Sequence, residues 1–358
     1  GQPVALTDQK RAEILAANDS MTGDALRVLG LAYRVVEQQP SEYADKTLEK
    51  DLVFAGLVGM IDPPRVEVAP ALQTARGAGI RTIMITGDYP NTAAAIAESI
   101  TLLEPGGKAV TGKQLDEMDD TALQETVKST SVFARVSPEH KMRIVQALQA
   151  NNQIVAMTGD GVNDAPAIKM ADIGVAMGIT GTDVAKETAD MVLTDDNYVS
   201  IVSAVEQGRI IYSNIRKFVY YLISCNMAEI LVIFIPTILG YGSPLQAIQL
   251  LWLNLVTDGA PALALGTEKG DPDIMEQKPR PYNEPIINQQ MRIGVLIQAI
   301  FITSATLGAF FIGLAHNEDY AHTMAFITLS VSELLRAYTA RSEFFPLLKI
   351  GIFGNKWM

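Results

Sequence analysis

The sequence has very little cysteine or histidine. It holds one cysteine, Cys225, and three histidines that lie far apart, His140, His316 and His322. A single cysteine cannot close a disulfide within the chain, and these positions lack the close spacing of a zinc site. The composition therefore excludes a disulfide framework and a cysteine-rich metal site, and it gives no sign of a zinc cluster.

Positive charge is also in short supply. The chain has 28 Lys and Arg against 40 Asp and Glu, which gives a formal net charge of -12. Proteins that bind duplex nucleic acid normally cluster Lys and Arg against the phosphates. No such basic patch occurs, so we expect no nucleic-acid partner.

Long apolar runs, in contrast, are abundant in the second half. Within 358 residues, a length that predicts two or three domains, four runs approach the roughly 20 residues that a spanning helix needs. They cover residues 218–239, 247–265, 293–315 and 323–339. The last run contains Glu333 and Arg336 and is the weakest of the four. The sequence predicts four transmembrane helices in a lipid bilayer.

The loops predict the orientation of these helices. Residues 240–246 and 316–322 contain no Lys or Arg, whereas the segments before the first span, between the second and third, and after the fourth contain several. Lys and Arg gather on the cytoplasmic side of membrane proteins. We therefore expect a multi-pass integral membrane protein whose large soluble part is cytoplasmic.

The soluble half alternates between strand-like and helix-like patterns. From about residue 53 to 193, short β-rich runs such as LVFAGLVGMI, IRTIMIT, QIVAMT and IGVAM are separated by helical patterns. This order predicts a parallel sheet with helices on both faces, whose ligands lie beyond the carboxyl ends of the strands. Polar clusters fall at two such ends, at residues 86–88 and 158–164.

These clusters suggest phosphoryl transfer. The Thr86 hydroxyl and the amides beside Gly87 can hold phosphate oxygens, and Asp160 and Asp164 can supply hard oxygen ligands to Mg²⁺. Lys141 can neutralise phosphate charge. A TGD string alone could equally be a strand-to-helix turn with an aspartate cap. The longer string TGDGVNDAP is too specific for that interpretation.

Four motifs carry a family resemblance. GMIDPPR (59–65), MITGD (84–88), FARVSPEHK (133–141) and TGDGVNDAP (158–166) resemble the phosphorylation domain of P-type cation-transporting ATPases. YLISCNMAEI (221–230) and LLWLNLVTDGAPALALG (250–266) look like the fifth and sixth membrane helices of the calcium-pump branch. The resemblance implies a haloacid-dehalogenase-like α/β fold, with a doubly wound parallel sheet, joined to an α-helical transmembrane bundle.

The resemblance also implies a domain order. It places the end of the nucleotide-binding domain at residues 1–50, the phosphorylation domain at 51–198 and a stalk helix at 199–217. The four membrane helices with the ion site fall at 218–341, and a cytoplasmic tail before further spans falls at 342–358. The pattern over residues 199–221 contains no proline, so one continuous helix could couple the phosphorylation domain to the ion site.

By the same resemblance, the catalytic residues are Thr86, Gly87, Asp88, Lys141, Asp160, Asn163 and Asp164, with Asp160 on Mg²⁺. ATP would contact Arg27 and Arg135 together with Thr86, Asp88 and Lys141. For Arg27, a solvated arginine on a helix is a competing interpretation.

The family's nucleophile, the aspartate of a DKTGT motif, does not occur in these residues. The nearest string, at residues 45–48, lacks the glycine and precedes a strand, so we interpret it as a surface segment. We expect the DKTGT segment, an actuator domain, and earlier and later membrane helices to belong to a remainder of the pump outside this chain.

Polar residues inside the apolar runs predict a cation site. Ionisable groups within spans are costly and mark ion paths or internal pairs. Asn226 and Glu229 share one helix face, and Asn254, Thr257 and Asp258 share another. With Glu333, these positions match calcium-pump ligands by resemblance. We expect Pro261 to break its helix, Arg336 to be able to pair with Glu333, and Cys225 to be a packed residue on another face.

The leading hypothesis is ATP-driven export of Ca²⁺ from the cytoplasm through an aspartyl-phosphate. A pump for another hard cation, Na⁺, K⁺ or Mg²⁺, is the alternative within the class. From other classes, a membrane-bound phosphatase of the same α/β fold and a catalytically incomplete binding subunit stay open. The absence of a Cys-Pro-Cys pair argues against a heavy-metal pump.

Overall fold

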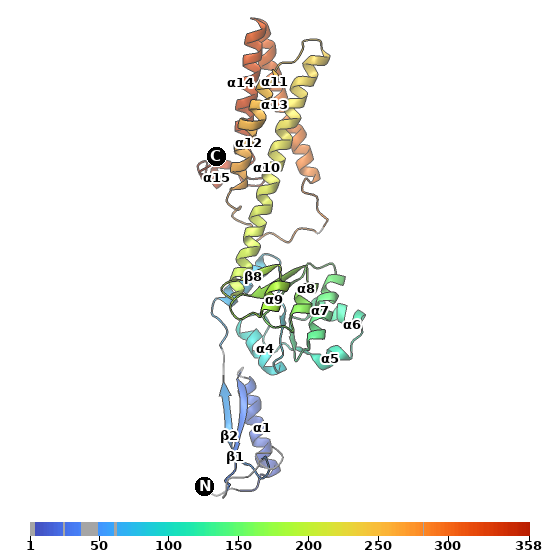
Figure 1. Cartoon of the computed structure of the whole chain (residues 1–358), viewed down its shortest axis with the longest axis vertical. Helices are drawn as coiled ribbons and strands as arrows, with labels where there is room; N and C mark the ends of the chain where they lie inside the picture. Colours follow the sequence, from blue (N-terminus) through green and yellow to red (C-terminus); the bar gives the residue numbers. More distant parts are fainter. Residues whose placement is uncertain (1–3, 24–25, 37–48, 61–62, 282) are drawn as a thin grey trace. The chain divides into compact units, whose positions relative to one another are not determined.

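The computed structural model describes residues 4–23, 26–36, 49–60, 63–281 and 283–358 (Figure 1). They form two compact units. The first lies within residues 1–76 and 80–202, and the second comprises residues 77–79 and 203–358.

The first unit begins with α1 (Asp8–Gly23), β1 (Arg27–Tyr33) and β2 (Val53–Met60). β1 and β2 pair antiparallel, from Arg27 opposite Met60 to Tyr33 opposite Val53. The prediction that residues 53–60 join the parallel sheet is therefore wrong. A short apolar run shows that a strand is present but not which strand pairs with it. The string at 45–48 lies outside the described residues.

The rest of this unit alternates strands and helices, as predicted. The helices are α3 (Val68–Gly77), α4 (Pro90–Ser99), α5 (Gly112–Asp116), α6 (Asp120–Ser129), α7 (Pro138–Ala150), α8 (Ala165–Met170) and α9 (Asp183–Thr188). The strands are β3 (Met84–Ile85), β4 (Val110–Thr111), β5 (Val132–Ala134), β6 (Ala156–Gly159), β7 (Ile173–Met177) and β8 (Met191–Leu193). They form two parallel three-stranded sheets in the orders β3-β5-β4 and β6-β7-β8.

Helix α7 links the cores of the two sheets. Its Ile144 packs with Phe133 of β5, while the adjacent Val145 packs with Met157 of β6 and Ala176 of β7. The start of α7 is fixed by Ser137, whose side chain caps the helix in a reciprocal capping box with His140. Lys141, in the first turn, is thereby placed next to β6.

The second unit is helical. Helix α10 (Tyr198–Ile238) is one continuous helix of 41 residues, which continues through the predicted stalk into the first apolar run (Figure 1). The other elements are α11 (Ala247–Trp252), the π-helical stretch η1 (Leu253–Asp258), α12 (Gly259–Gly266), α13 (Gln289–Leu314), α14 (Glu318–Thr339) and α15 (Leu347–Ile350).

Three described helices are long and apolar enough to cross a membrane: α10, the continuous helix over residues 247–266, and α13. Helix α14 has 22 residues and packs closely on α13 where the chain turns. A Cβ on Gly313 would lie 2.5 Å from the Ala321 Cα, so only glycine permits this approach. That α14 also spans the membrane stays a prediction.

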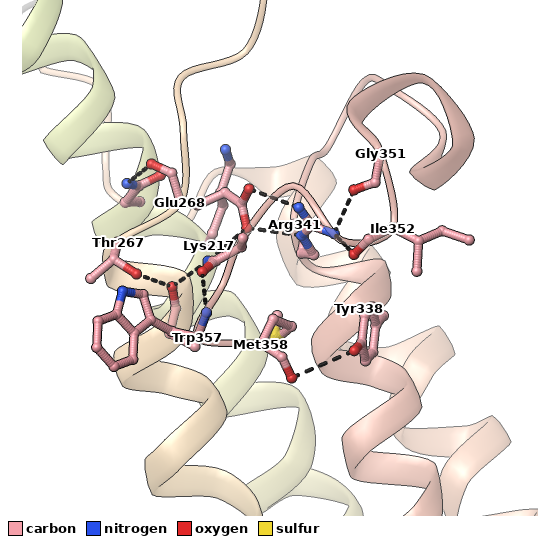
Figure 2. A network of polar contacts seen from close by, with 12 residues as sticks. Lys217, Thr267, Glu268, Tyr338, Arg341, Gly351, Ile352, Trp357 and Met358 are labelled. Atoms are coloured by element: carbon pink, nitrogen blue, oxygen red, sulfur yellow. Dashed lines mark hydrogen bonds and ion pairs between the residues drawn. The ribbon is translucent and has the colours of Figure 1, made fainter.

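A buried polar network joins the end of α12 to the end of α14 (Figure 2). The fully buried Arg341 guanidinium donates to both Glu268 carboxylate oxygens, at 2.8 and 3.0 Å, and to the carbonyls of Gly351 and Ile352. Asn355 donates to the Ala264 carbonyl and to Glu268. Burial would raise the pKa of Glu268, but the bonds from Arg341 and Asn355 lower it overall. The network fixes the end of α14 against the end of α12. Helix α14 carries Glu333, and Asp258 directly precedes α12.

Candidate functional sites

The turn after β6 brings three predicted residues together. The Lys141 ammonium lies 2.5 Å from Oδ1 of Asp164, and Oδ2 of Asp164 accepts from the backbone N–H groups of Asp160 and Gly161 at 3.3 and 3.2 Å. Gly159 is required because an added Cβ would lie 2.4 Å from the Asp164 Cβ. The glycine-rich turn therefore wraps around the carboxylate of Asp164.

Asp164 is a carboxylate whose charge is satisfied within the protein. Burial tends to raise its pKa, but the hydrogen bond and charge of Lys141, with the two backbone donors, lower the pKa below the ordinary value. Asp164 consequently stays ionised at neutral pH and holds the Lys141 ammonium at the carboxyl end of β6.

The turn after β3 forms a second cluster. The Thr86 hydroxyl donates to Asp88 at 2.9 Å and accepts from the Asp88 N–H at 3.1 Å. The N–H of Arg135 donates to the Asp88 carbonyl, and the Arg135 guanidinium lies over the Tyr89 ring at 3.8 Å. Arg135 has a positive φ of 54°, a conformation that non-glycine residues rarely adopt.

Among the described residues, no hydrogen bond or ion pair joins the two turns to each other. Asn163 is exposed on the second turn. Arg27 is exposed and is the first residue of strand β1, so the alternative of an arginine on a helix is wrong.

The residues present fit a Mg²⁺ ion at the turn after β6. The exposed Asp160 carboxylate, at the carboxyl end of that strand, takes part in no hydrogen bond or ion pair among the described residues. A free carboxylate is the hard oxygen donor that Mg²⁺ prefers. Asp164, by contrast, already binds Lys141, so Asp160 is the better placed of the two carboxylates as a direct ligand.

A different arrangement lies among the membrane helices. Sγ of Cys225 and carboxylate oxygens of Asp258 and Glu333 lie within 4.8 Å of one another, and all three residues are buried. Glu333 is 0% exposed and Asp258 is 1% exposed. Both oxygens of Glu333 and Oδ2 of Asp258 lack a hydrogen-bond partner within the described part of the chain. Two buried carboxylates so close together, with free oxygens, are an arrangement that a cation stabilises.

The helix around Asp258 is widened by a π-helical turn but is not interrupted. The prediction that Pro261 breaks the helix is wrong, because residues 247–266 are helical throughout and the wide π turn η1 takes the place of a break. Pro261 has no N–H to give to the carbonyl of Thr257, four residues earlier. The Tyr221 hydroxyl lies 2.9 Å from that carbonyl and 3.1 Å from Oδ1 of Asp258, so its one proton serves both.

The remaining predicted membrane ligands form an outer group. Glu229 is buried and accepts from the Asn254 amide at 3.2 and 3.3 Å. The Thr257 hydroxyl donates to the Leu253 carbonyl. Asn226 is exposed, and its amide donates to the Leu222 carbonyl of its own helix. Glu229 and Asn254 are thus brought together, whereas Asn226 is not part of the buried group.

Two expectations about this region need correction. Arg336 does not pair with Glu333: its guanidinium donates to Ser224 at 3.3 Å and Thr339 at 3.0 Å, and it lies over the Tyr220 ring. Cys225 does not point to another face but lies beside Asp258 and Glu333. Helical spacing could have found Cys225, because it precedes Glu229 by four residues and so shares its face.

Three models of known protein families match parts of this chain. Residues 242–358 match the family described as "Cation transporting ATPase, C-terminus", and residues 1–67 match "P-type ATPase, cytoplasmic domain N". Residues 141–205, which include Lys141 and the turn after β6, match "haloacid dehalogenase-like hydrolase". The chain belongs to the P-type cation-transporting ATPases. The resemblance found in the sequence and the predicted fold class are confirmed.

Curated relatives of this P-type ATPase chain are similar along its whole length. The Calcium-transporting ATPase 1 of Bacillus cereus is 46% identical over 375 residues, covering 100% of the chain and 42% of the relative. The Calcium-transporting ATPase of Bacillus subtilis is 47% identical over 346 residues, covering 96% and 39%. The Calcium-transporting ATPase type 2C member 1 of Bos taurus is 40% identical over 358 residues, covering 99% and 36%. The chain spans about two fifths of the length of these relatives.

Proposed function

We propose that this chain is the part of an ATP-driven calcium pump that holds the phosphoryl group during transfer and binds Ca²⁺ within the membrane. The observation that carries the proposal is the buried pair Asp258 and Glu333, in which three of the four carboxylate oxygens lack a hydrogen-bond partner among the described residues. The names of the relatives support Ca²⁺ as the transported ion.

In the cytoplasmic unit, the two turns supply different parts of phosphoryl transfer. The Thr86 hydroxyl and the amides around Gly87 bind phosphate oxygens, and the Lys141 ammonium, held by Asp164, offsets their negative charge. Asn163 lies exposed on the second turn, where it can hydrogen-bond the phosphorylated group. Mg²⁺, bound by Asp160, would neutralise charge on the transferring group.

Further contacts to ATP and the nucleophile complete the proposal. Arg135, exposed at the turn after β3, and Arg27, exposed on β1, would contact the phosphates of ATP. No DKTGT motif occurs in the sequence, so the nucleophilic aspartate would come from a segment outside these residues.

Within the membrane, Ca²⁺ fits the donor set. Calcium takes six to eight oxygen ligands in flexible geometry. Asp258 and Glu333 would contribute carboxylates, and Glu229, Asn254 and Thr257 further oxygens. Asn226 would have to release the Leu222 carbonyl to join them. The soluble unit would then lie on the cytoplasmic side, and transport would be outward from the cytoplasm.

The test uses the full-length protein that contains this chain, reconstituted in sealed vesicles. We expect ATP-dependent uptake of labelled Ca²⁺ and a Ca²⁺-dependent, hydroxylamine-sensitive phosphoenzyme from labelled ATP. Asp258→Asn should abolish both. Asp319→Asn, at an exposed carboxylate of α14, is the matched control and should change neither.

Other outcomes would replace the proposal. A phosphoenzyme that depends on Na⁺, K⁺ or Mg²⁺ instead of Ca²⁺ would identify a pump for that cation. Hydrolysis of soluble phosphate esters without any cation uptake would indicate a membrane-bound phosphatase.

A further inference from the structure

A basic cavity of about 660 Å³ lies within the second unit, along the part of α10 that precedes its apolar run. Its walls come from α10, from the segment between α12 and α13, and from the segment after α14. The basic residues that line it are Arg209, Arg216, Lys217, Lys278 and Arg280. The acidic residues are Asp271, Glu284 and Glu343. Five positive charges against three negative ones leave an excess of positive charge around the cavity.

Three buried donors in the wall have no hydrogen-bond partner among the residues that the structure describes. They are the Tyr212 hydroxyl, Nε of Arg216 and Nζ of Lys217. Lys217 is only 2% exposed, and its nearest carboxylate oxygen, Oδ1 of Asp271, is 3.6 Å away, which is too long for a hydrogen bond. Buried polar groups nearly always find partners, because an unpaired donor costs the desolvation free energy of that group.

Other donors in the same wall already have hydrogen-bond or ion-pair partners within the protein. The Arg209 guanidinium donates to the carbonyls of Ile274 and Gln277 at 2.9 and 2.8 Å. One terminal nitrogen of Arg216 reaches Glu343 at 3.3 Å. The donors without a hydrogen bond among the described residues are therefore one guanidinium N–H, a phenol and the Lys217 ammonium, whose charge is balanced by Asp271 at 3.6 Å. All three lie on α10 within six residues of one another.

The position of the cavity points to the membrane surface. Lys217 immediately precedes the apolar run that begins at residue 218. The lining residues between 271 and 284 lie between the end of α12 at Gly266 and the start of α13 at Gln289. The lining residues 343 and 344 come shortly after the end of α14 at Thr339. These helix ends lie on one side of the predicted bilayer. Lys217 is beside the network of Arg341 and Glu268 in Figure 2.

We propose that this cavity binds a phosphate group and that the group is the headgroup phosphate of an acidic phospholipid. A phosphate offers several acceptor oxygens to the ammonium, the guanidinium and the phenol at once, and charge-assisted bonds of this kind are strong. Basic pockets between membrane helices on the cytoplasmic side are suited to anionic headgroups. The proposal is independent of the identity of the transported cation.

The test is native mass spectrometry of the detergent-purified full-length protein, titrated with phosphatidylglycerol or phosphatidylcholine. We expect one phosphatidylglycerol to stay bound, in preference to phosphatidylcholine. The double variant Lys217→Met with Asp271→Asn removes the ammonium without leaving its carboxylate unpaired, and it should weaken phosphatidylglycerol binding about tenfold. Lys269→Met, at an exposed lysine of the same loop outside the cavity wall, should leave binding unchanged.

A second variant tests the proposal at an exposed residue, where a substitution should leave the fold intact. Lys278 is exposed in the cavity wall, so Lys278→Met should weaken binding severalfold while the thermal unfolding midpoint stays that of the parent. Inorganic phosphate forms the other arm. Displacement of the lipid by millimolar phosphate, with the same dependence on Lys217, would keep the phosphate site but assign it to a soluble phosphate compound. Equal retention of both lipids, or equal binding by the Lys217 and Lys269 variants, would overturn the proposal.

Discussion

The two carboxylate sites of this chain differ in how their charge is balanced. In the soluble unit, Asp164 is bound by Lys141 and by two backbone N–H groups, so its charge is complete without a ligand. In the helical unit, Asp258 and Glu333 are more deeply buried, and each has at least one oxygen that receives no hydrogen bond from the residues described. A carboxylate with internal partners stabilises the fold, whereas a buried one without them is maintained for something that binds there.

The largest expected effect would come from Glu333→Gln. Removing one of the three buried carboxylate charges should lower Ca²⁺ affinity on the order of a hundredfold, because calcium affinity follows the number of charged ligands. The same change should raise the thermal unfolding midpoint measured without cation. Glu318→Gln, on the same helix but exposed, should alter neither quantity. Unchanged Ca²⁺ binding, measured by equilibrium dialysis, would show that Glu333 is not a ligand.

In the soluble site, Asp164→Asn should have the opposite effect on stability. It weakens the bond to Lys141, and we expect local opening of β6 and α8 to become easier by about 2 kcal/mol. Hydrogen exchange of their amides measures this. Asp160→Asn is the comparison, because that carboxylate has no internal partner: stability should hold while phosphoenzyme formation fails. Equal destabilisation by both variants would remove the distinction between them.

A smaller effect is expected from Cys225→Ser. The thiol lies beside the two unpaired carboxylates, and sulfur is a softer ligand than oxygen. The serine variant should bind Ca²⁺ as before but lose roughly tenfold in the ability of Cd²⁺ to displace it. Displacement titrations with labelled Ca²⁺ provide the measurement. If Cd²⁺ competes equally in both proteins, the thiol does not reach the cation.

The smallest effect is a pH dependence of the soluble unit. The folded pKa of Asp164 lies below that of an unfolded aspartate, about 3.9. Its contribution to stability is therefore full above pH 3.9 and is lost as the pH falls through the lower, folded value. The difference in exchange protection between the parent and Asp164→Asn should shrink below about pH 4. A difference that stayed constant there would contradict the assignment.

Local signals in the sequence predicted much of the soluble site. The sequence pattern predicts a helix over residues 138–150, and α7 has these bounds. Its start could be predicted because Ser137, Pro138 and the reciprocal bond to His140 are local start signals. The turns after β3 and β6 were predicted from their position at strand ends. The pairing of β1 with β2 was missed, since pairing depends on contacts with distant parts of the chain.

In the membrane unit, the polar residues within the apolar runs indicated which carboxylates form the candidate cation site. The contacts of each side chain could be found only from the structure. Arg336 is one turn from Glu333, yet its guanidinium reaches Ser224, 112 residues away in sequence. The ion pair of Arg341 with Glu268 joins residues 73 apart. Spacing along a helix cannot indicate which neighbouring helix a long side chain will contact. Which membrane residues bind the cation stays a prediction.

The π turn η1 makes the helix at Asp258 sensitive to single-residue length changes. A π turn accommodates one extra residue within an otherwise α-helical path. Deleting one residue between Leu253 and Asp258 would let the segment return to an ordinary α-helix. If the segment were α-helical with its present number of residues, each later side chain would point about 100° away from its present direction. The direction in which Asp258 points is thus set by residue count as well as by residue type. For a relative that is α-helical throughout this segment, an alignment without a one-residue gap here would therefore compare side chains that face different ways.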